Sequence, residues 1–424
     1  MHRLKYAILA VVCLAVVAVL DAATNELDTA RYYWDFAIYY DMAENGLANN
    51  VHLIAPFAYR FATPLLARIL TDILPEGPEV VILASADGAM FATRTVTGFR
   101  IIAYAGAATC LTLVFALAEA FGASSRQALA AVAVVAFSLY NVKFLLFDVS
   151  RPDHLAYPLM VIGMLAVFRR NVLLCLMASC TGLLVREFLI IPPTILFVLL
   201  LGDYRAHCSH KTLANLAAIV LATGLFVIAP RALIPITDTG QYVDPINDPD
   251  TLANLFKAPL SERRDFNILF NLVSYTMPIW LLLTWSRLKN AWLRLVGYRL
   301  ILGLYTGLVL VLTMYGGTDI WRFVSYLFIP QVIVLVALLK DESVRWGEVV
   351  VMLAAIMAYN KITQDIPNYH AQYLDFYGGY DSRVNTATLW RIGQMGLLLA
   401  GMLIFRAALS RRAIQQAARR GLSG

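Results

Sequence analysis

The sequence predicts an all-α, polytopic membrane protein, and three observations lead to this fold class. Hydrophobic residues make up 60% of the 424 residues and charged residues only 15%, whereas soluble globular proteins have about 45–50% and about 25%. The apolar residues also occur in runs that approach the roughly 20 residues a helix needs to cross a bilayer. Finally, most of these runs are joined by short connections, which indicates a single transmembrane domain over residues 1–424.

About twelve apolar runs are candidates for transmembrane helices, and several of them are short. They lie near residues 5–20, 97–120, 125–147, 154–168, 171–185, 188–201, 212–234, 267–286, 297–315, 322–340, 345–360 and 388–408. The first run follows Arg3 and Lys5, a pattern that also fits a signal peptide, but no small-residue cleavage pattern follows Leu20. We therefore expect an uncleaved first helix.

The distribution of charge predicts that both termini face the cytoplasm. Basic residues stand directly at helix ends in short loops of one side, as at Arg169-Arg170 and between Arg287 and Arg299, and cytoplasmic loops favour Lys and Arg. Acidic residues gather mainly in three long loops of the other side. These outer loops span residues 21–96, 235–266 and 361–387. We expect an integral protein of the plasma (inner) membrane whose function lies on its outer face.

Several kinds of site are not expected. The net charge of +6 is explained by the cytoplasmic loops, so no nucleic-acid partner is predicted. The five cysteines fall in predicted spans or on the inner side, which leaves no outer disulfide or cysteine-based metal site. The histidines show no paired spacing typical of zinc. No metal or other cofactor is evident, although the outer acidic groups are compatible with a divalent cation.

The first outer loop is too long to be a simple connection, and it contains two predicted amphipathic helices. In residues 32–47, Phe36, Tyr39 and Tyr40 recur at helical spacing before a stop at Asn45-Gly46. A second segment, residues 63–70, has Pro64 at an early helical position. Both segments are predicted to lie in the membrane interface.

These residues also carry a resemblance to a known family. The loop contains an Asp-Phe-x-x-Tyr-Tyr segment from Asp35 to Tyr40, then Pro56-Phe57-Ala58-Tyr59-Arg60 and Pro64. A first span followed by such a loop resembles the glycosyltransferase-C (GT-C) superfamily of polytopic enzymes. The resemblance covers the topology of the whole chain and the motif of residues 28–64.

The resemblance implies a glycosyltransferase that uses a polyprenyl-phosphate sugar as donor. The acceptor would be a lipid-linked glycan, a lipid or a protein, and the first outer loop would supply a catalytic acid. Asp35 matches that position and is the first candidate for the general base, with Asp28 and Asp41 as rivals. The alternative is that Asp35 is a solvated residue on the wet face of an interfacial helix.

Charged residues at other outer helix ends are further candidates. Asp148 and Asp153 flank a very short turn that also contains Arg151, and the family-like interpretation gives these carboxylates a catalytic or acceptor-positioning role. The alternative is an Asp148–Arg151 ion pair with Asp153 as a helix cap. Lys143, just over one turn before Asp148, is predicted to extend outward.

Arg186 and Glu187 interrupt an apolar stretch at a depth where charges are costly unless paired or functional. Arg186 is a candidate phosphate ligand and Glu187 a candidate acceptor ligand; alternatively, both lie at a hairpin tip that reaches water. Tyr59 and Arg60 form the family-like Tyr-Arg element and are candidates for donor binding. The alternative for Arg60 is an ordinary interfacial arginine.

Asp319 and Arg322 present an acid and a base at another outer helix end. Asp319 is predicted to cap the following helix, while Arg322 lies about one turn deeper, where a lipid phosphate would be held. A simple Asp319–Arg322 pair would satisfy the same residues.

Two other classes of membrane protein remain as alternatives. A secondary transporter or lipid-glycan flippase would carry broken helices or ionisable groups near mid-membrane. A glycan polymerase or ligase would depend on basic outer loops more than on an acid in the first loop.

Overall fold

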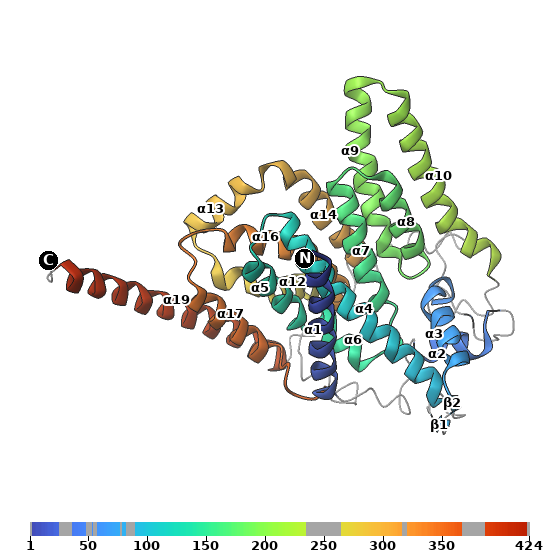
Figure 1. Cartoon of the computed structure of the whole chain (residues 1–424), viewed down its shortest axis with the longest axis horizontal. Coiled ribbons are helices and arrows are strands. Elements are labelled where there is room, and N and C mark those ends of the chain that lie inside the picture. The colour runs from blue at the N-terminus through green and yellow to red at the C-terminus, as the bar shows by residue number, and fades with distance from the viewer. Residues whose placement is uncertain are drawn as a thin grey trace.

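The computed structural model describes residues 2–24, 36–47, 53, 57–76, 79–81, 90–234, 264–315, 320–366 and 386–421 (Figure 1). The elements of the first part are α1 (His2–Ala22), α2 (Phe36–Asn45), η2 (Phe57–Tyr59), α3 (Ala62–Ile73), β1 (Glu79–Val81), β2 (Met90–Ala92), α4 (Thr93–Ala120), α5 (Ser125–Ala136), η3 (Leu139–Lys143), α6 (Phe144–Phe147), α7 (Asp153–Phe168), α8 (Val172–Leu183), η4 (Glu187–Ile190), α9 (Ile191–His207) and α10 (His210–Leu233). Those of the second part are α12 (Arg264–Leu282), α13 (Trp285–Arg294), η6 (Val296–Tyr298), α14 (Arg299–Tyr315), α15 (Ile320–Val324), η7 (Ser325–Leu327), α16 (Phe328–Leu339), α17 (Trp346–Tyr359) and α19 (Thr386–Gly421).

The protein is a helical, membrane-embedded protein. Within the described residues, seven helices are long and apolar enough to cross a membrane, or nine if each of two bent helix pairs forms one span. Three further apolar helices, α7, α8 and α17, are shorter. A described helix lies at each of the twelve predicted windows, but a count of twelve spans is not confirmed.

The first outer loop contains the two predicted amphipathic helices, α2 and α3. It also contains an element that was not predicted, a two-stranded antiparallel ribbon that pairs Glu79 with Ala92. On α3, Thr63 and Ala67 are buried, whereas Leu65, Ile69 and Ile73 are exposed. Such an exposed apolar face suits the interfacial position predicted for this helix.

Figure 1 shows α2, α3 and the ribbon together at one end of the molecule, while the tips of α9 and α10 project at the other. We call the first of these the α2–α3 end. A small apolar core attaches α2 and α3 to the bundle by joining Tyr40 and Phe57 to Phe99 of α4 and to Phe144 and Trp321. This core places the first-loop helices beside the start of α7 and beside α15.

Helix α4 is the centre of the bundle, because α1, α3, α5 and α7 all pack against it. α4 and α7 approach closely at Gly106, where a Cβ atom would lie only 2.4 Å from the carbonyl oxygen of His154 in the first turn of α7. Glycine is therefore needed at this position for α7 to begin where it does.

We predict that Gly106→Ala lowers the free energy of unfolding by about 1–3 kcal/mol, as for other overpacked interiors. The matched control is Gly303→Ala in α14, because a Cβ atom at Gly303 meets nothing within 4 Å. The midpoint of thermal unfolding in detergent measures both variants. Equal midpoints for Gly106→Ala and Gly303→Ala would contradict the close packing of α4 on α7.

Two apolar helical segments depart from regular α-helix inside the bundle. Helix α5 and the segment Leu139–Phe147 meet at a bend of 64°, and the first residues of that segment form a π-helical turn, η3. Because α5 has 12 residues and rises about 18 Å, the break lies well inside an apolar layer of about 30 Å. A second irregularity is the 3-10 turn η7 between α15 and α16, which lies within the continuous helical segment Ile320–Leu339.

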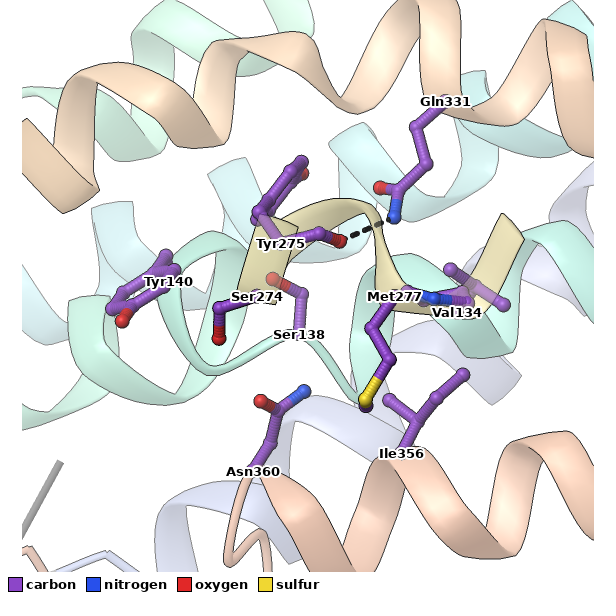
Figure 2. Close-up of a pocket in the computed structure, with 10 residues that line it drawn as sticks. Val134, Ser138, Tyr140, Ser274, Tyr275, Met277, Gln331, Ile356 and Asn360 are labelled. Carbon is purple, nitrogen blue, oxygen red and sulfur yellow. Dashed lines mark hydrogen bonds between the residues drawn. The ribbon is translucent and has the colours of Figure 1, made fainter. Parts of the chain in front are cut away.

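Polar side chains join η3 to η7. The hydroxyl of Tyr275 lies within hydrogen-bond distance of two acceptors, Oδ1 of Asn141 (2.6 Å) and the carbonyl oxygen of Ser325 (3.0 Å), and its one proton is shared between them. Nδ2 of Asn141 donates to the same carbonyl (3.3 Å). Figure 2 shows the small polar pocket beside this junction, where Gln331 donates to the carbonyl oxygen of Tyr275 at 2.9 Å. Hydrogen bonds thus replace the helix ladder where it is interrupted.

Candidate functional site

A cluster of charged residues is buried where α7, η4 and α15 meet. Asp153 is the first residue of α7, and its carboxylate lies between two guanidinium groups. Nε of Arg186 is 3.5 Å from Oδ1, and Nε of Arg322 is 3.9 Å from Oδ2. The hydroxyl of Tyr326 donates to Oδ1 at 2.8 Å. All four side chains are buried.

A second ion pair adjoins this group. Nε of Arg60 donates to Oε1 of Glu187 at 2.9 Å, and NH1 of Arg60 donates to the hydroxyl of Tyr39 on α2 at 3.4 Å. Burial acts to lower the pKa of Arg60, but the carboxylate of Glu187 and the hydroxyl of Tyr39 outweigh burial and raise it. Arg60 therefore carries its positive charge at every physiological pH.

The local backbone explains why neighbouring residues serve different pairs. Arg186 lies between α8 and η4 with extended backbone angles (φ −159°, ψ 139°), and successive side chains of an extended chain point to opposite sides. Arg186 thus reaches Asp153, while Glu187 reaches Arg60. We call Arg60, Asp153, Arg186, Glu187 and Arg322 the charge cluster.

Aromatic rings form one wall of the charge cluster. Phe188 stacks on Phe323 and on Tyr326, with ring centroids 5.3 and 4.4 Å apart. The guanidinium carbons of Arg186 and Arg322 lie 5.5 and 5.6 Å from the ring of Phe323. These rings contribute cation–π contacts and replace water around the charges, which strengthens the electrostatic interactions inside the cluster.

Arg186 has an unusual environment for a buried arginine. Its side chain is fully buried, and none of its three nitrogens makes a hydrogen bond with the described part of the chain. Buried polar groups without hydrogen bonds are rare and costly. The cluster also contains three arginines but only two carboxylates. An anionic group that accepts hydrogen bonds from Arg186 would complete this arrangement.

Asp148 belongs to a separate ion pair at the same end of the bundle. Nε of Arg151 donates to Oδ2 of Asp148 at 2.6 Å, and Ser150 donates to Oδ1 at 2.9 Å. This pairing is the structural alternative anticipated from the sequence. Burial and then the carboxylate of Asp148 raise the pKa of Tyr40, which shows that α2 packs close to this pair as well.

The remaining sequence candidates divide into two groups. Asp35, Asp28 and Asp319 lie outside the described residues, although Phe36, which follows Asp35, begins α2. Asp41 and Tyr59 are described and do not join the charge cluster. Asp41 accepts a hydrogen bond from Asn45 (2.6 Å), and the ring of Tyr59 lies 4.8 Å from the guanidinium carbon of Arg231.

Several structural alternatives from the sequence are wrong. Asp153 does not cap α7, because the cap residue is Pro152 and no side chain caps the helix. Arg186 does not reach water at a hairpin tip, and Arg60 is not an exposed interfacial arginine, since both are buried. Lys143 is buried and donates to the carbonyl oxygens of Lys361 and Ile362 at 3.1 and 2.8 Å, at the start of the predicted outer loop 361–387, so its predicted direction is not contradicted.

Sequence reasoning missed the aromatic members of the site. Tyr39 was predicted only as one residue on the apolar face of an interfacial helix. Tyr326, Phe188 and Phe323 were not predicted as site residues. Their proximity to Arg186 and Arg322 in the sequence was the available signal, because aromatic residues beside buried arginines often make cation–π contacts.

No metal site is found within the part of the chain that the structure describes, since no group of three or more His, Cys, Asp or Glu side chains could hold an ion there. The acidic residues within 25–35, 82–89, 235–263, 316–319 and 367–385 lie outside that search. No family model matches the chain, and no curated protein or solved structure matches it significantly.

Proposed function

We propose that this protein is a membrane glycosyltransferase of the GT-C type that transfers a sugar from a polyprenyl-phosphate donor to a lipid-linked glycan, a lipid or a protein. The α2–α3 end would face the outer side of the plasma membrane, with both termini in the cytoplasm. The observation that carries the proposal is the buried, incompletely hydrogen-bonded Arg186 beside Arg322 and Arg60, next to the first-loop helix α2.

The chemistry of the reaction assigns a role to each part of the site. An acceptor hydroxyl attacks the anomeric carbon of the sugar, the bond from that carbon to the phosphate oxygen breaks, and the configuration inverts. Arg60, Arg186 and Arg322 hold the departing phosphate. The hydroxyl proton passes to a carboxylate, for which Asp35 is the proposed base. Asp153 and Glu187 keep the arginines in position through the ion pairs of the charge cluster.

Several features support this assignment over a scaffold. Burying arginines together with acids has a high desolvation cost, and a scaffold gives no reason to bury them together. The donor lipid stays in the bilayer, so a phosphate site should lie at the membrane end of helices and against lipid-facing elements. α3 supplies such an element, because Leu65 and Ile69 are exposed beside the Arg60 segment.

We predict that Arg186→Ala and Arg322→Ala weaken binding of a polyprenyl-phosphate donor by about tenfold or more, since each removes a charge-assisted contact of about 1.5–3 kcal/mol. Acceptor binding should change much less. The matched control is Arg126→Ala, an exposed arginine at the start of α5. Donor titration of the purified protein measures the effect. Equal losses of donor and acceptor binding would instead support purely structural ion pairs.

A transporter or lipid-glycan flippase is a second candidate, and one observation favours it. The break at η3 lies inside the bundle and is joined by Asn141, Tyr275 and Ser325 to the 3-10 turn η7; transporters also contain discontinuous helices. A transporter would move an intact glycolipid or solute across vesicles, whereas a transferase would cleave the donor. A glycan polymerase or ligase is distinguished by a diphosphate-linked donor.

A further inference from the structure

A pocket of about 270 Å³ lies far from the charge cluster. It is lined by Ala120, Phe121, Arg294, Leu295, Tyr298, Ile333, Val336, Ala337 and Lys340. These residues belong to the C-terminal end of α4, to α13 with η6, and to α16. Because α4 has 28 residues and rises about 42 Å, the pocket is separated by the length of that helix from the ribbon at the α2–α3 end.

The floor of the pocket is apolar and its rim is aromatic. Leu295, Ile333 and Val336 are buried. At the rim, the rings of Phe121 and Tyr298 lie 4.7 Å apart. The volume is slightly below the range of about 300–1,000 Å³ that encloses a drug-sized ligand. It suits a headgroup rather than a complete lipid.

Two cationic side chains at this pocket use only some of their N–H groups in hydrogen bonds to the protein. NH1 of Arg294 donates to the carbonyl oxygen of Ala337 (3.0 Å), and Nζ of Lys340 donates to that of Phe121 (2.6 Å). A guanidinium has five N–H groups and an ammonium has three. Asp341, 3.8 Å from Arg294, offsets one charge and accepts hydrogen bonds from neutral partners, including Asn290 at 2.7 Å. The pocket therefore keeps a net positive charge.

The surroundings place the pocket at headgroup level. Helix α13 bends by 101° from α12 and exposes Trp285 and Trp292, which are 81% and 56% accessible. Tryptophan prefers the boundary between acyl chains and headgroups. Arg299 stacks on Trp292, with its guanidinium carbon 4.2 Å from the ring. An amphipathic helix with this composition lies along the membrane surface.

We propose that this pocket binds the headgroup phosphate of an anionic phospholipid from the adjacent leaflet, with Arg294 and Lys340 as its ligands. Charge complementarity selects an anionic lipid over a zwitterionic one. This site is independent of the proposed sugar transfer at the other end of the bundle.

The test is native mass spectrometry of the full-length protein in detergent, titrated with phosphatidylglycerol or with phosphatidylcholine of the same chains. We expect one retained phosphatidylglycerol, weakened at least about tenfold in the double variant Arg294→Gln/Lys340→Gln. The matched control Arg411→Gln/Arg412→Gln removes two exposed cations from α19 and should keep the adduct. Three results would overturn the proposal: phosphatidylglycerol retained by Arg294→Gln/Lys340→Gln, equal loss of phosphatidylglycerol from this variant and the control, or equal binding of phosphatidylcholine.

Two further variants separate binding from folding, because Arg294 and Lys340 also bond to backbone carbonyls. Arg294→Lys/Lys340→Arg keeps both charges and should keep the adduct. Ala337→Phe fills the pocket without changing charge and should remove it while the protein remains folded by circular dichroism. Inorganic phosphate at millimolar concentration should not displace the lipid; displacement would identify a free-phosphate site and overturn the lipid assignment.

Discussion

Replacing Asp153 with alanine is expected to remove most of the folded protein from the membrane. The substitution leaves the buried Arg186 without its ion-pair partner and deprives Arg322 of a carboxylate 3.9 Å away. Breaking a buried pair by removing one partner costs about 3–5 kcal/mol, a large share of the roughly 5–15 kcal/mol that stabilises a typical protein. Membrane abundance and the thermal unfolding midpoint measure the loss.

A matched control is available at the molecular surface. Asp203 pairs with Arg170 at 3.0 Å, but both side chains are about half exposed, so Asp203→Ala should cost no more than about 1 kcal/mol. The double variant Asp153→Ala/Arg186→Met should be more stable than Asp153→Ala alone, because it buries one fewer guanidinium that has lost its carboxylate partner. An Asp153→Ala variant as stable as wild type would mean that the charge cluster is not buried as described.

Replacing Asp35 with asparagine is expected to abolish sugar transfer while leaving the protein at normal abundance. A general base typically contributes about 10²–10⁴-fold to the rate, so we expect turnover to fall by at least 100-fold. The assay follows a labelled sugar from a polyprenyl-phosphate donor in vesicles. Abundance should persist because Asp35 lies before α2 rather than in the described core.

The matched control for this prediction is Asp41→Asn, because Asp41 lies on α2 and accepts a hydrogen bond from Asn45. Its turnover should remain within a few-fold of wild type. Loss of activity in Asp41→Asn, together with normal turnover in Asp35→Asn, would transfer the role of base to Asp41. Normal turnover in both would leave Asp28 as the remaining candidate base in the first outer loop.

The helices could be predicted from the sequence, but their breaks could not. Apolar runs identify segments that must be buried or face lipid, so each window holds a helix. The π-turn at Leu139–Lys143 depends on Tyr275, a residue of a distant helix that holds Asn141 in place. The 101° bend before Trp285 lies where the apolar α12 ends and α13 begins. The hydropathy of a segment does not indicate where such a turn or bend lies.

For the candidate site, sequence identified the charged residues but not their partners. Arg186 and Glu187 were marked because charges inside an apolar stretch are costly. Their partners, Asp153 and Arg60, come from other elements, and Arg60 is 127 residues from Glu187. Such pairs are set by tertiary packing, including the close contact at Gly106 that positions the start of α7. Tyr326 was missed for the same reason.

The proposed transferase activity is tested most directly by measuring whether the donor lipid is cleaved. Purified wild-type protein in vesicles would receive polyprenyl-phosphate sugars from a panel of labelled hexoses and pentoses, together with a membrane extract as acceptor. The account predicts that one donor is consumed, with one free polyprenyl phosphate released for each sugar moved to another molecule. Passage of intact donor across the bilayer, with no polyprenyl phosphate released, would contradict it.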